Sequence, residues 1–347
     1  MEKFVFELND VNGYCIFQNL PLSLRTRMNF APGMHLFVRP CYEDMFTVFN
    51  KSMSENGPDV VPFVGTAGIG KSCLFLYILA RWFVSKNGLL QSFYYQISNN
   101  QVFFFNANMS GEFELTRIAS AESALNADIP LFVDMKDQCL PVDHEGKIFI
   151  FSSFQPSRYK EITKEKVTYT IPVWSEAEYG AYLSTDYFWT DHKLDRSETS
   201  HQYLVEKSIS IYGGSFRNVI VAIARVLEGY ATDLGWLVNE ALTNKGQSVA
   251  NTIFVNGFRG NDAEISDVLI HRNPPINDGK IVYGSESVVH NVASPYIFQK
   301  LMELQADTYS NKMKVKFGGD MFGGGDDGVL FEHLSLNVFT IAEKKFI

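Results

Sequence analysis

The stretch GTAGIGKS, residues 65–72, constrains this chain more than any other feature of its sequence. It satisfies the pattern of glycine, four residues, glycine, lysine and serine that builds a phosphate-binding loop. Gly65, Gly68 and Gly70 let the backbone bend so that successive N–H groups face an anion, and the dipole of a following helix adds positive charge there. The apolar run VVPFVG precedes the loop and KSCLFLYILARWFV follows it. The sequence therefore predicts a strand, a phosphate loop and a helix in that order.

Each residue of the loop has an expected role. Lys71 is expected to reach the β- and γ-phosphates of a nucleotide, and the hydroxyl of Ser72 to ligate Mg²⁺. The alternative, a chance glycine-rich turn, is disfavoured because the strand and the helix agree with the loop pattern. The residues expected to surround the phosphates are Gly65, Thr66, Ala67, Gly68, Ile69, Gly70, Lys71, Ser72 and Cys73.

A hydrolytic site of this kind also needs an acidic residue at the end of a second buried strand, where it holds Mg²⁺. The run LFVD, which ends at Asp134, has that form. Asp134 could instead only begin a turn. A glutamate that orients the attacking water is expected directly after the aspartate, but Met135 stands there. Asp137 can replace it only if the loop curls back, so the sequence favours slow hydrolysis.

Further polar residues are candidates for contact with the phosphates. Ser152 and Ser153 end the next apolar run, IFIFSS, where a polar sensor of the γ-phosphate would project, and Arg158 follows in an expected loop. Arg217 begins an expected helix after a glycine pair, from which a cation could reach the phosphates. The alternatives are turn serines and a surface arginine.

Composition limits the class of protein. The 347 residues are 46% hydrophobic, which predicts a globular chain of one large or two modest domains. A net charge of −9 shows no basic face for nucleic acid at the level of composition. The four cysteines lack the spacing of a zinc site. Neither a secretory signal nor an apolar run long enough for a membrane span is found, so we expect an intracellular protein.

The pattern along the chain predicts an α/β fold of four parts. These are an N-terminal extension over 1–57, a phosphate-loop core over 58–172, a helical lid over 173–250, and a smaller C-terminal α+β segment over 251–347. Two aromatic runs around residues 99–100 predict a hairpin or a pair of adjacent strands, and a helix is expected near 113–125. The repeated units of strand and helix predict a mainly parallel sheet with helices on its faces.

The last segment carries acidic residues that permit a second chemistry. Asp326, Asp327 and Glu332, followed by Glu343 and two lysines, resemble the carboxylates and lysine of a divalent-metal nuclease. The alternative is a solvated loop and a terminal strand, which the short separation of these residues favours.

Several stretches together resemble the NTPase domain shared by Crinkler effectors and retrotransposon-hot-spot proteins. They are HLFVRPCYEDMF, VPFVGTAGIGKSCLFLYILAR, LFVD, FSSFQPSRYKE, YTIPVWSEAEY and YGGSFRNVI, spread over residues 35–220, with LIHRNPP and GVLFEH farther on. The resemblance implies a phosphate-loop ATPase of the additional-strand class, similar to the AAA+ and STAND groups. By position it assigns ATP and Mg²⁺ to Lys71, Ser72 and Asp134, and a further role to Arg217.

The resemblance also implies a partner. In that family the ATPase is usually joined to a restriction-endonuclease-like domain and acts on nucleic acid in a nucleus, and residues 251–347 are where such a domain would begin. Two alternatives stay open, namely a nucleotide-binding scaffold or switch with negligible hydrolysis, and a nuclease-linked toxin. A protein partner or a homo-oligomer is compatible with each of these functions.

Overall fold

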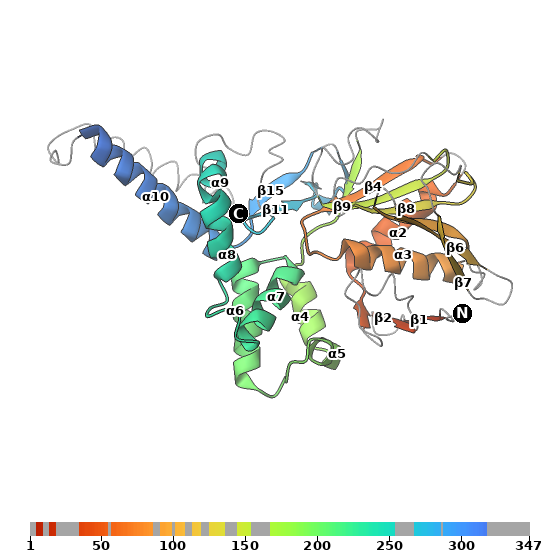
Figure 1. The fold of residues 1–347 in the computed structure, drawn as a ribbon, viewed down its shortest axis with the longest axis horizontal. Coiled ribbons are helices and arrows are strands. Elements are labelled where there is room, and N and C mark those ends of the chain that lie inside the picture. Colours follow the sequence, from red (N-terminus) through yellow and green to blue (C-terminus); the bar gives the residue numbers. More distant parts are fainter. Residues whose placement is uncertain are drawn as a thin grey trace.

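The fold is taken from a computed structural model of the chain (Figure 1). It describes residues 5–9, 14–18, 35–54, 57–85, 91–98, 101–107, 113–118, 125–135, 144–153, 167–253, 267–285 and 287–317. Arg158, Asp137 and the acidic residues after 317 lie outside these ranges, so the predictions made for them stay predictions.

A sheet of eight strands forms the centre of the described structure, in the order β14-β10-β4-β9-β8-β5-β6-β7. The five neighbouring strands β10, β4, β9, β8 and β5 run parallel, whereas β14, at one edge, and β6 and β7, at the other, join through antiparallel pairing. The predicted mainly parallel α/β sheet is thereby confirmed. The bounds of the strands are β4 Val60–Gly65, β5 Phe93–Ser98, β6 Gln101–Ala107, β7 Phe113–Ile118, β8 Leu131–Met135, β9 Ile148–Ser153, β10 Thr168–Thr170 and β14 Gly284–Ser285.

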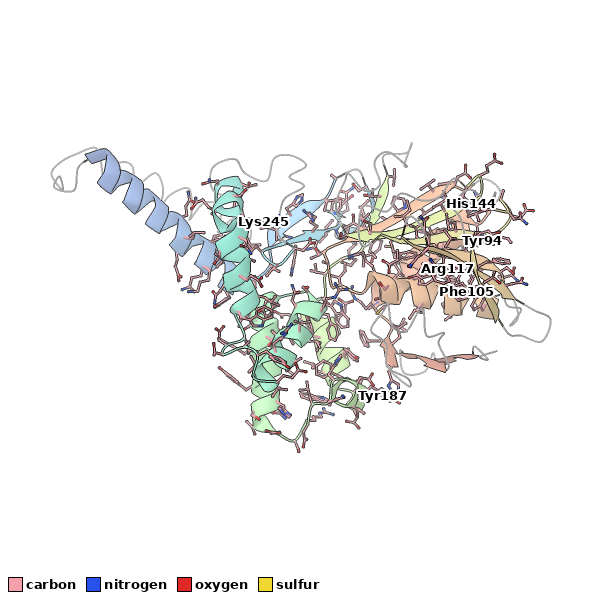
Figure 2. The ribbon with its side chains drawn as sticks, in the orientation of Figure 1. Tyr94, Phe105, Arg117, His144, Tyr187 and Lys245 are labelled. Atoms are coloured by element: carbon pink, nitrogen blue, oxygen red, sulfur yellow. The ribbon has the colours of Figure 1, made fainter. Side chains whose placement is uncertain are left out.

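The predicted helix near 113–125 is wrong, because β7 occupies residues 113–118. Its sequence FELTRI alternates between apolar and polar residues with a period of two, which suits a strand. Its backbone pairs antiparallel with β6 over the whole of its length, and this pairing supplies hydrogen bonds that a helix would not offer to β6. The predicted hairpin around residues 99–100 is confirmed by the antiparallel pair β5 and β6, whose Tyr94 and Phe105 are marked in Figure 2.

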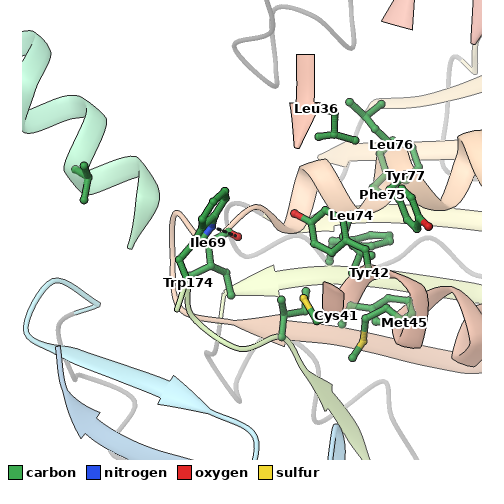
Figure 3. Close-up of a cluster of buried hydrophobic side chains, with 14 of the residues drawn as sticks. Leu36, Cys41, Tyr42, Met45, Ile69, Leu74, Phe75, Leu76, Tyr77 and Trp174 are labelled. Carbon is green, nitrogen blue, oxygen red and sulfur yellow. Dashed lines mark hydrogen bonds between the residues drawn. The ribbon is translucent and has the colours of Figure 1, made fainter. Parts of the chain in front are cut away.

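Aromatic side chains fill the space between the sheet and the helices α2, Pro40–Ser52, and α3, Lys71–Ser85. Phe75 of α3 packs against Phe132 of β8 at 5.2 Å between ring centroids and against Phe151 of β9 at 5.6 Å. Figure 3 shows part of this cluster where α2 and α3 meet. Because α3 is apolar for nearly its whole length, it is buried against the sheet. Its burial, together with that of β4, fixes both ends of the loop between them.

A small antiparallel sheet precedes α2, made of β1 Val5–Asn9, β2 Tyr14–Gln18 and β3 His35–Phe37. The stretch MHLFVRPCYEDMFTVFN forms β3 and α2. Phe49 of α2 packs edge-on against Trp82 of α3, with ring centroids 5.6 Å apart. The N-terminal part is therefore joined to the core through α2.

Helices follow β10, as the sequence predicts, and lie beside the sheet in Figure 1. We call the chain from α4 to α9 the helical segment. Gly213 and Gly214 separate α6 from α7, and the start of α7 contacts the loop between β4 and α3. The bounds are α4 Glu176–Leu183, α5 Asp186–Asp191, α6 Thr199–Tyr212, α7 Phe216–Leu227, α8 Trp236–Ala241 and α9 Gln247–Asn251, with a π-helical turn, Leu242–Gly246, between the last two.

The chain after the helical segment returns to the sheet. Its strand β14 pairs with β10, and β11, Ile270–Asn273, pairs with β15, Val289–Val292. A two-stranded hairpin of β12, Ile276–Asn277, and β13, Lys280–Ile281, lies between them, and α10, Pro295–Phe317, extends away from the sheet in Figure 1. Among the described residues, no helix combines the length and the apolar character needed to cross a membrane.

Candidate functional site

The loop between β4 and α3 has the backbone bends that its glycines predict. Gly68 and Gly70 have φ values of +81° and +101°, a region that residues with a side chain rarely adopt. A Cβ atom on Gly68 would lie 2.6 Å from Cβ of Arg217, and one on Gly70 would lie 2.6 Å from the hydroxyl of Tyr42. These two positions accept only glycine, for conformational and for steric reasons.

Lys71 folds back over the beginning of the loop. Its ammonium donates hydrogen bonds to the carbonyl oxygens of Gly65, at 3.0 Å, and Thr66, at 2.8 Å. These bonds hold the positive charge at the loop and leave the side chain half-buried. The ammonium therefore lies against the beginning of the loop, and its expected contact with phosphate stays a prediction.

The middle of the loop contacts the start of α7. The backbone N–H of Arg217 donates to the carbonyl of Gly68 at 3.0 Å, and the hydroxyl of Ser215 donates to the carbonyl of Ala67 at 3.1 Å. The helical segment is thus bonded directly to the loop backbone. A displacement of α7 would break both bonds.

The end of the loop is held by a second set of donors. The carbonyl of Ile69 accepts hydrogen bonds from the guanidinium of Arg39, at 3.0 Å, and from the indole N–H of Trp174, at 3.2 Å, the bond drawn in Figure 3. The hydroxyl of Tyr42 donates to the carbonyl of Gly70 at 3.0 Å. Buried polar donors from two further parts of the chain thereby fix the last two carbonyls before α3.

These bonds determine where the loop N–H groups point. In a trans peptide the C=O of one residue and the N–H of the next point in opposite directions. The bonds to the carbonyls of Ala67 and Ile69 therefore turn the N–H groups of Gly68 and Gly70 to the other side of the loop. Neither of these N–H groups donates a hydrogen bond to another residue that the structure describes. Such an arrangement of N–H groups next to a helix N-terminus is typical of an anion site.

Asp134 lies at the carboxyl end of β8, with 7% of its surface exposed. The hydroxyl of Tyr95 lies 3.4 Å from its Oδ2, and the Tyr95 ring stacks on Phe75 of α3 at 4.9 Å between centroids. Because side chains alternate along a strand, Asp134 shares its face of the sheet with Phe132, which packs on Phe75 of α3. The structure places the predicted acidic residue on the side of the loop, but it describes nothing of Asp137.

Ser153 ends β9 and lies opposite Gly65 of β4 in the strand register. Side chains alternate along a strand, so Ser153 shares its face with Phe151, which packs on α3. Ser152 points to the other face, is fully buried, and donates its hydroxyl to the carbonyl of Ser153. Of the two serines, Ser153 is the one that the strand places next to the loop.

Arg217 has an exposed side chain at the first turn of α7. Burial raises the pKa of the Cys73 thiol to about 11, and the charges of Arg217 and Arg39 act against that rise. The Cys73 thiol is thus protonated at neutral pH, and the Arg217 charge lies near the start of α3. The backbone of Arg217 thus contacts the loop from α7, and the expected contact of its cation with phosphate stays a prediction.

Sequence reasoning missed the residues that hold the loop from outside. Arg39, Tyr42, Trp174 and Ser215 are not among the residues predicted from the sequence, although all four lie within stretches that carry the family resemblance. A fifth is Arg272, whose backbone N–H donates to the buried hydroxyl of Thr66 at 2.9 Å. Their spacing in the sequence does not assign them to the loop, because each contacts it through a hydrogen bond between distant parts of the chain.

Among the described residues, no three His, Cys, Asp or Glu side chains gather in a way that could hold a metal ion. A site for Mg²⁺ would therefore need the hydroxyl of Ser72 and the phosphates of a nucleotide besides Asp134. Comparison with known proteins finds no protein-family model, no curated protein and no solved structure that matches the chain.

Proposed function

We propose that this chain is a phosphate-loop ATPase that binds ATP with Mg²⁺ at residues 65–72. The observation that supports it most is the set of hydrogen bonds to the carbonyls of Ala67, Gly68, Ile69 and Gly70 from residues outside the loop. These bonds prepare the loop before any ligand binds, and a prepared set of donors costs little reorganisation when charge arrives. A loop that served only as a turn would not need this support.

The side chains at the loop fit a nucleotide with its metal ion. Lys71 would neutralise the terminal phosphates, and Ser72 and Asp134 would hold the ion and its water shell. Mg²⁺, when bound, supplies positive charge against the phosphate oxygens. Of the other candidates, Ser153 is beside the loop strand and Arg217 beside the loop itself, so both are proposed to contact the phosphates.

The order of strands supports the finer class. β9 lies between β4, which carries the loop, and β8, which carries Asp134. One additional strand therefore separates the two, and we propose the additional-strand class to which the resemblance points. The Crinkler and retrotransposon-hot-spot relationship, the nucleic-acid partner and a nuclear location are part of this proposal and rest on the quoted motifs alone.

The contact of α7 with the loop supports a role in regulation. Ser215 and Arg217 bond the helical segment to Ala67 and Gly68, so a change in the loop on binding or hydrolysis would be felt by α7. We propose that the nucleotide state moves the helical segment and thereby controls a partner. Because Met135 follows Asp134, this proposal includes slow turnover.

The test measures ATP binding and phosphate release by the full chain and its variants. We expect Lys71→Ala to abolish tight binding, and Asp134→Asn to retain binding but lose Mg²⁺-dependent turnover. Lys147→Ala is the matched control, because Lys147 pairs with the exposed Asp59 near the opposite end of β4 and should leave both activities unchanged. Binding that survives Lys71→Ala would refute the site.

The absence of a glutamate after Asp134 favours one alternative, a nucleotide-binding switch with negligible hydrolysis. Nucleotide that stays bound through purification, without turnover at any concentration of protein or nucleic acid, would support the switch against the ATPase. A nuclease is the remaining alternative, and its residues Glu332 and Glu343 lie outside the described structure. It requires metal-dependent DNA cleavage that is lost when either glutamate is changed.

A further inference from the structure

Arg39 lies at the junction of three parts of the chain and has no exposed surface. It precedes α2, and its guanidinium donates to the carbonyl of Ile69 in the loop at 3.0 Å. It also donates to the carbonyls of Pro172 and Val173, each at 3.0 Å, in the connection between the sheet and the helical segment. The same group forms an ion pair with Glu178 of α4 at 2.8 Å. One side chain therefore touches the loop, the connection and the first helix after it.

Glu178 has a second task, which joins Arg39 to the start of α4. Its Oε2 accepts from the backbone N–H of Ser175 at 2.8 Å, and the Ser175 hydroxyl accepts from the N–H of Glu178 at 3.2 Å. This reciprocal pair is a capping box that defines the helix start. Burial would raise the pKa of Glu178, but the hydrogen bond and the charge of Arg39 lower it below its usual value. The Glu178 carboxylate of this capping box is thus kept charged in part by Arg39.

We infer that Arg39 is a positioning residue that sets the shape of the phosphate loop and couples it to α4. Its bond to the carbonyl of Ile69 turns the N–H of Gly70 toward the phosphate side of the loop, because the two groups of a trans peptide point in opposite directions. Any movement of Ile69 must be transmitted through the guanidinium to Glu178. The inference rests on the proposed function only in the experiments that measure the binding or the effect of ATP.

Among the described residues, neither of the other two donors to the end of the loop bonds to Glu178. Trp174 donates one hydrogen bond, to Ile69, and stacks beneath the guanidinium at 5.1 Å. Tyr42 donates its single hydroxyl to Gly70. Arginine has donors in a planar fork, whereas lysine has one compact ammonium, so lysine cannot reach the loop, the connection and Glu178 together.

The first experiment compares Arg39→Lys with Arg81→Lys in the full chain. Arg81 is the matched control. Like Arg39, it forms an ion pair between two parts of the fold, here with Glu43 between α3 and α2, but it does not bond to the loop. We expect Arg39→Lys to weaken ATP binding by at least tenfold, with a smaller effect on turnover at saturating ATP. Arg81→Lys should change either value by less than twofold. Equal effects of the two variants would overturn the inference.

The second experiment needs no nucleotide and therefore separates this inference from the proposed function. Amide hydrogen exchange is measured in the peptides that cover residues 65–74 and 175–183. Arg39→Lys should speed exchange in both peptides, and Arg81→Lys in neither. If only one of the two peptides responds to Arg39→Lys, the coupling is refuted. A wild-type chain that binds no ATP would reject the proposed function, and this experiment would still decide the role of Arg39.

Glu178→Gln approaches the link from the other end and serves if Arg39→Lys fails to fold. It removes the charge that Arg39 pairs with but leaves the bond from Arg39 to Ile69. We expect ATP to protect residues 175–183 from exchange in the wild type and not in Glu178→Gln, while the affinity for ATP changes less than threefold. Retained protection in the variant would overturn the coupling, as would protection that is absent from the wild type while ATP binds.

Discussion

Replacement of Gly68 by alanine tests the contact between the proposed phosphate loop and the helical segment. The φ value of Gly68 is +81°, and a Cβ atom would lie 2.6 Å from Cβ of Arg217 and 3.1 Å from the hydroxyl oxygen of Ser215. Neither neighbour can move without α7, since Arg217 and Ser215 stand at its start. We therefore expect Gly68→Ala to push the loop and α7 apart.

The expected loss of stability has two parts. An alanine in the left-handed region costs about 1–2 kcal/mol. The separation from α7 also breaks the bonds from Arg217 to Gly68 and from Ser215 to Ala67, each of which contributes about 0.5–1.5 kcal/mol. The sum is roughly 2–5 kcal/mol, which is a large share of the free energy of unfolding of a typical domain.

Gly229→Ala is the control, because Gly229 has a φ value of +76° and no atom within 4 Å of the position of a Cβ. It should lose only about 1–2 kcal/mol. The difference between the two variants in their free energy of unfolding by urea gives the steric part of the loss. ATP titration reports whether the loop still binds nucleotide. If Gly68→Ala is no less stable than Gly229→Ala and binds ATP as the wild type does, the described contact between loop and helix is wrong.

Three further predictions concern single groups. Tyr42→Phe removes the hydroxyl that donates to Gly70 and should lower the free energy of unfolding by about 0.5–1.5 kcal/mol, measured by urea unfolding. Burial lowers the pKa of His271 from 6.5 to about 4. Between these pH values the His271 imidazole is therefore protonated in the unfolded chain and neutral in the folded chain. Stability should therefore fall as the pH decreases from about 6.5 toward 4, by up to about 3 kcal/mol, and His271→Phe should remove part of this dependence in unfolding curves at pH 7.5 and 5. Tyr95→Phe removes the hydroxyl beside Asp134 and should change the Mg²⁺ concentration needed for half-maximal turnover while binding of ATP without metal stays constant. An unchanged Mg²⁺ dependence would contradict a metal role for Asp134.

The predicted elements differ in how well local patterns determine them. The strand VVPFVG and the apolar helix after it are strong signals, because a buried parallel strand and a buried helix are apolar over their whole length. The stretch near 113–125 was misjudged because the pairing of β7 with β6 decides its structure, and the partner strand is invisible in a local window. The same reason explains why β14, only two residues long, was not expected at the edge of the sheet.

The candidate site divides in the same way. Gly68, Gly70 and Lys71 follow from the sequence, because a phosphate loop needs backbone freedom and a cation at fixed spacing. Arg39 and Trp174 do not, because they lie about thirty residues before and a hundred residues after Ile69, whose carbonyl they both bond. The sequence by itself determined the loop, its strand and its helix, since these depend on neighbours along the chain. Only the tertiary structure decided which side chains hold the loop carbonyls, because long-range hydrogen bonds leave no periodic trace.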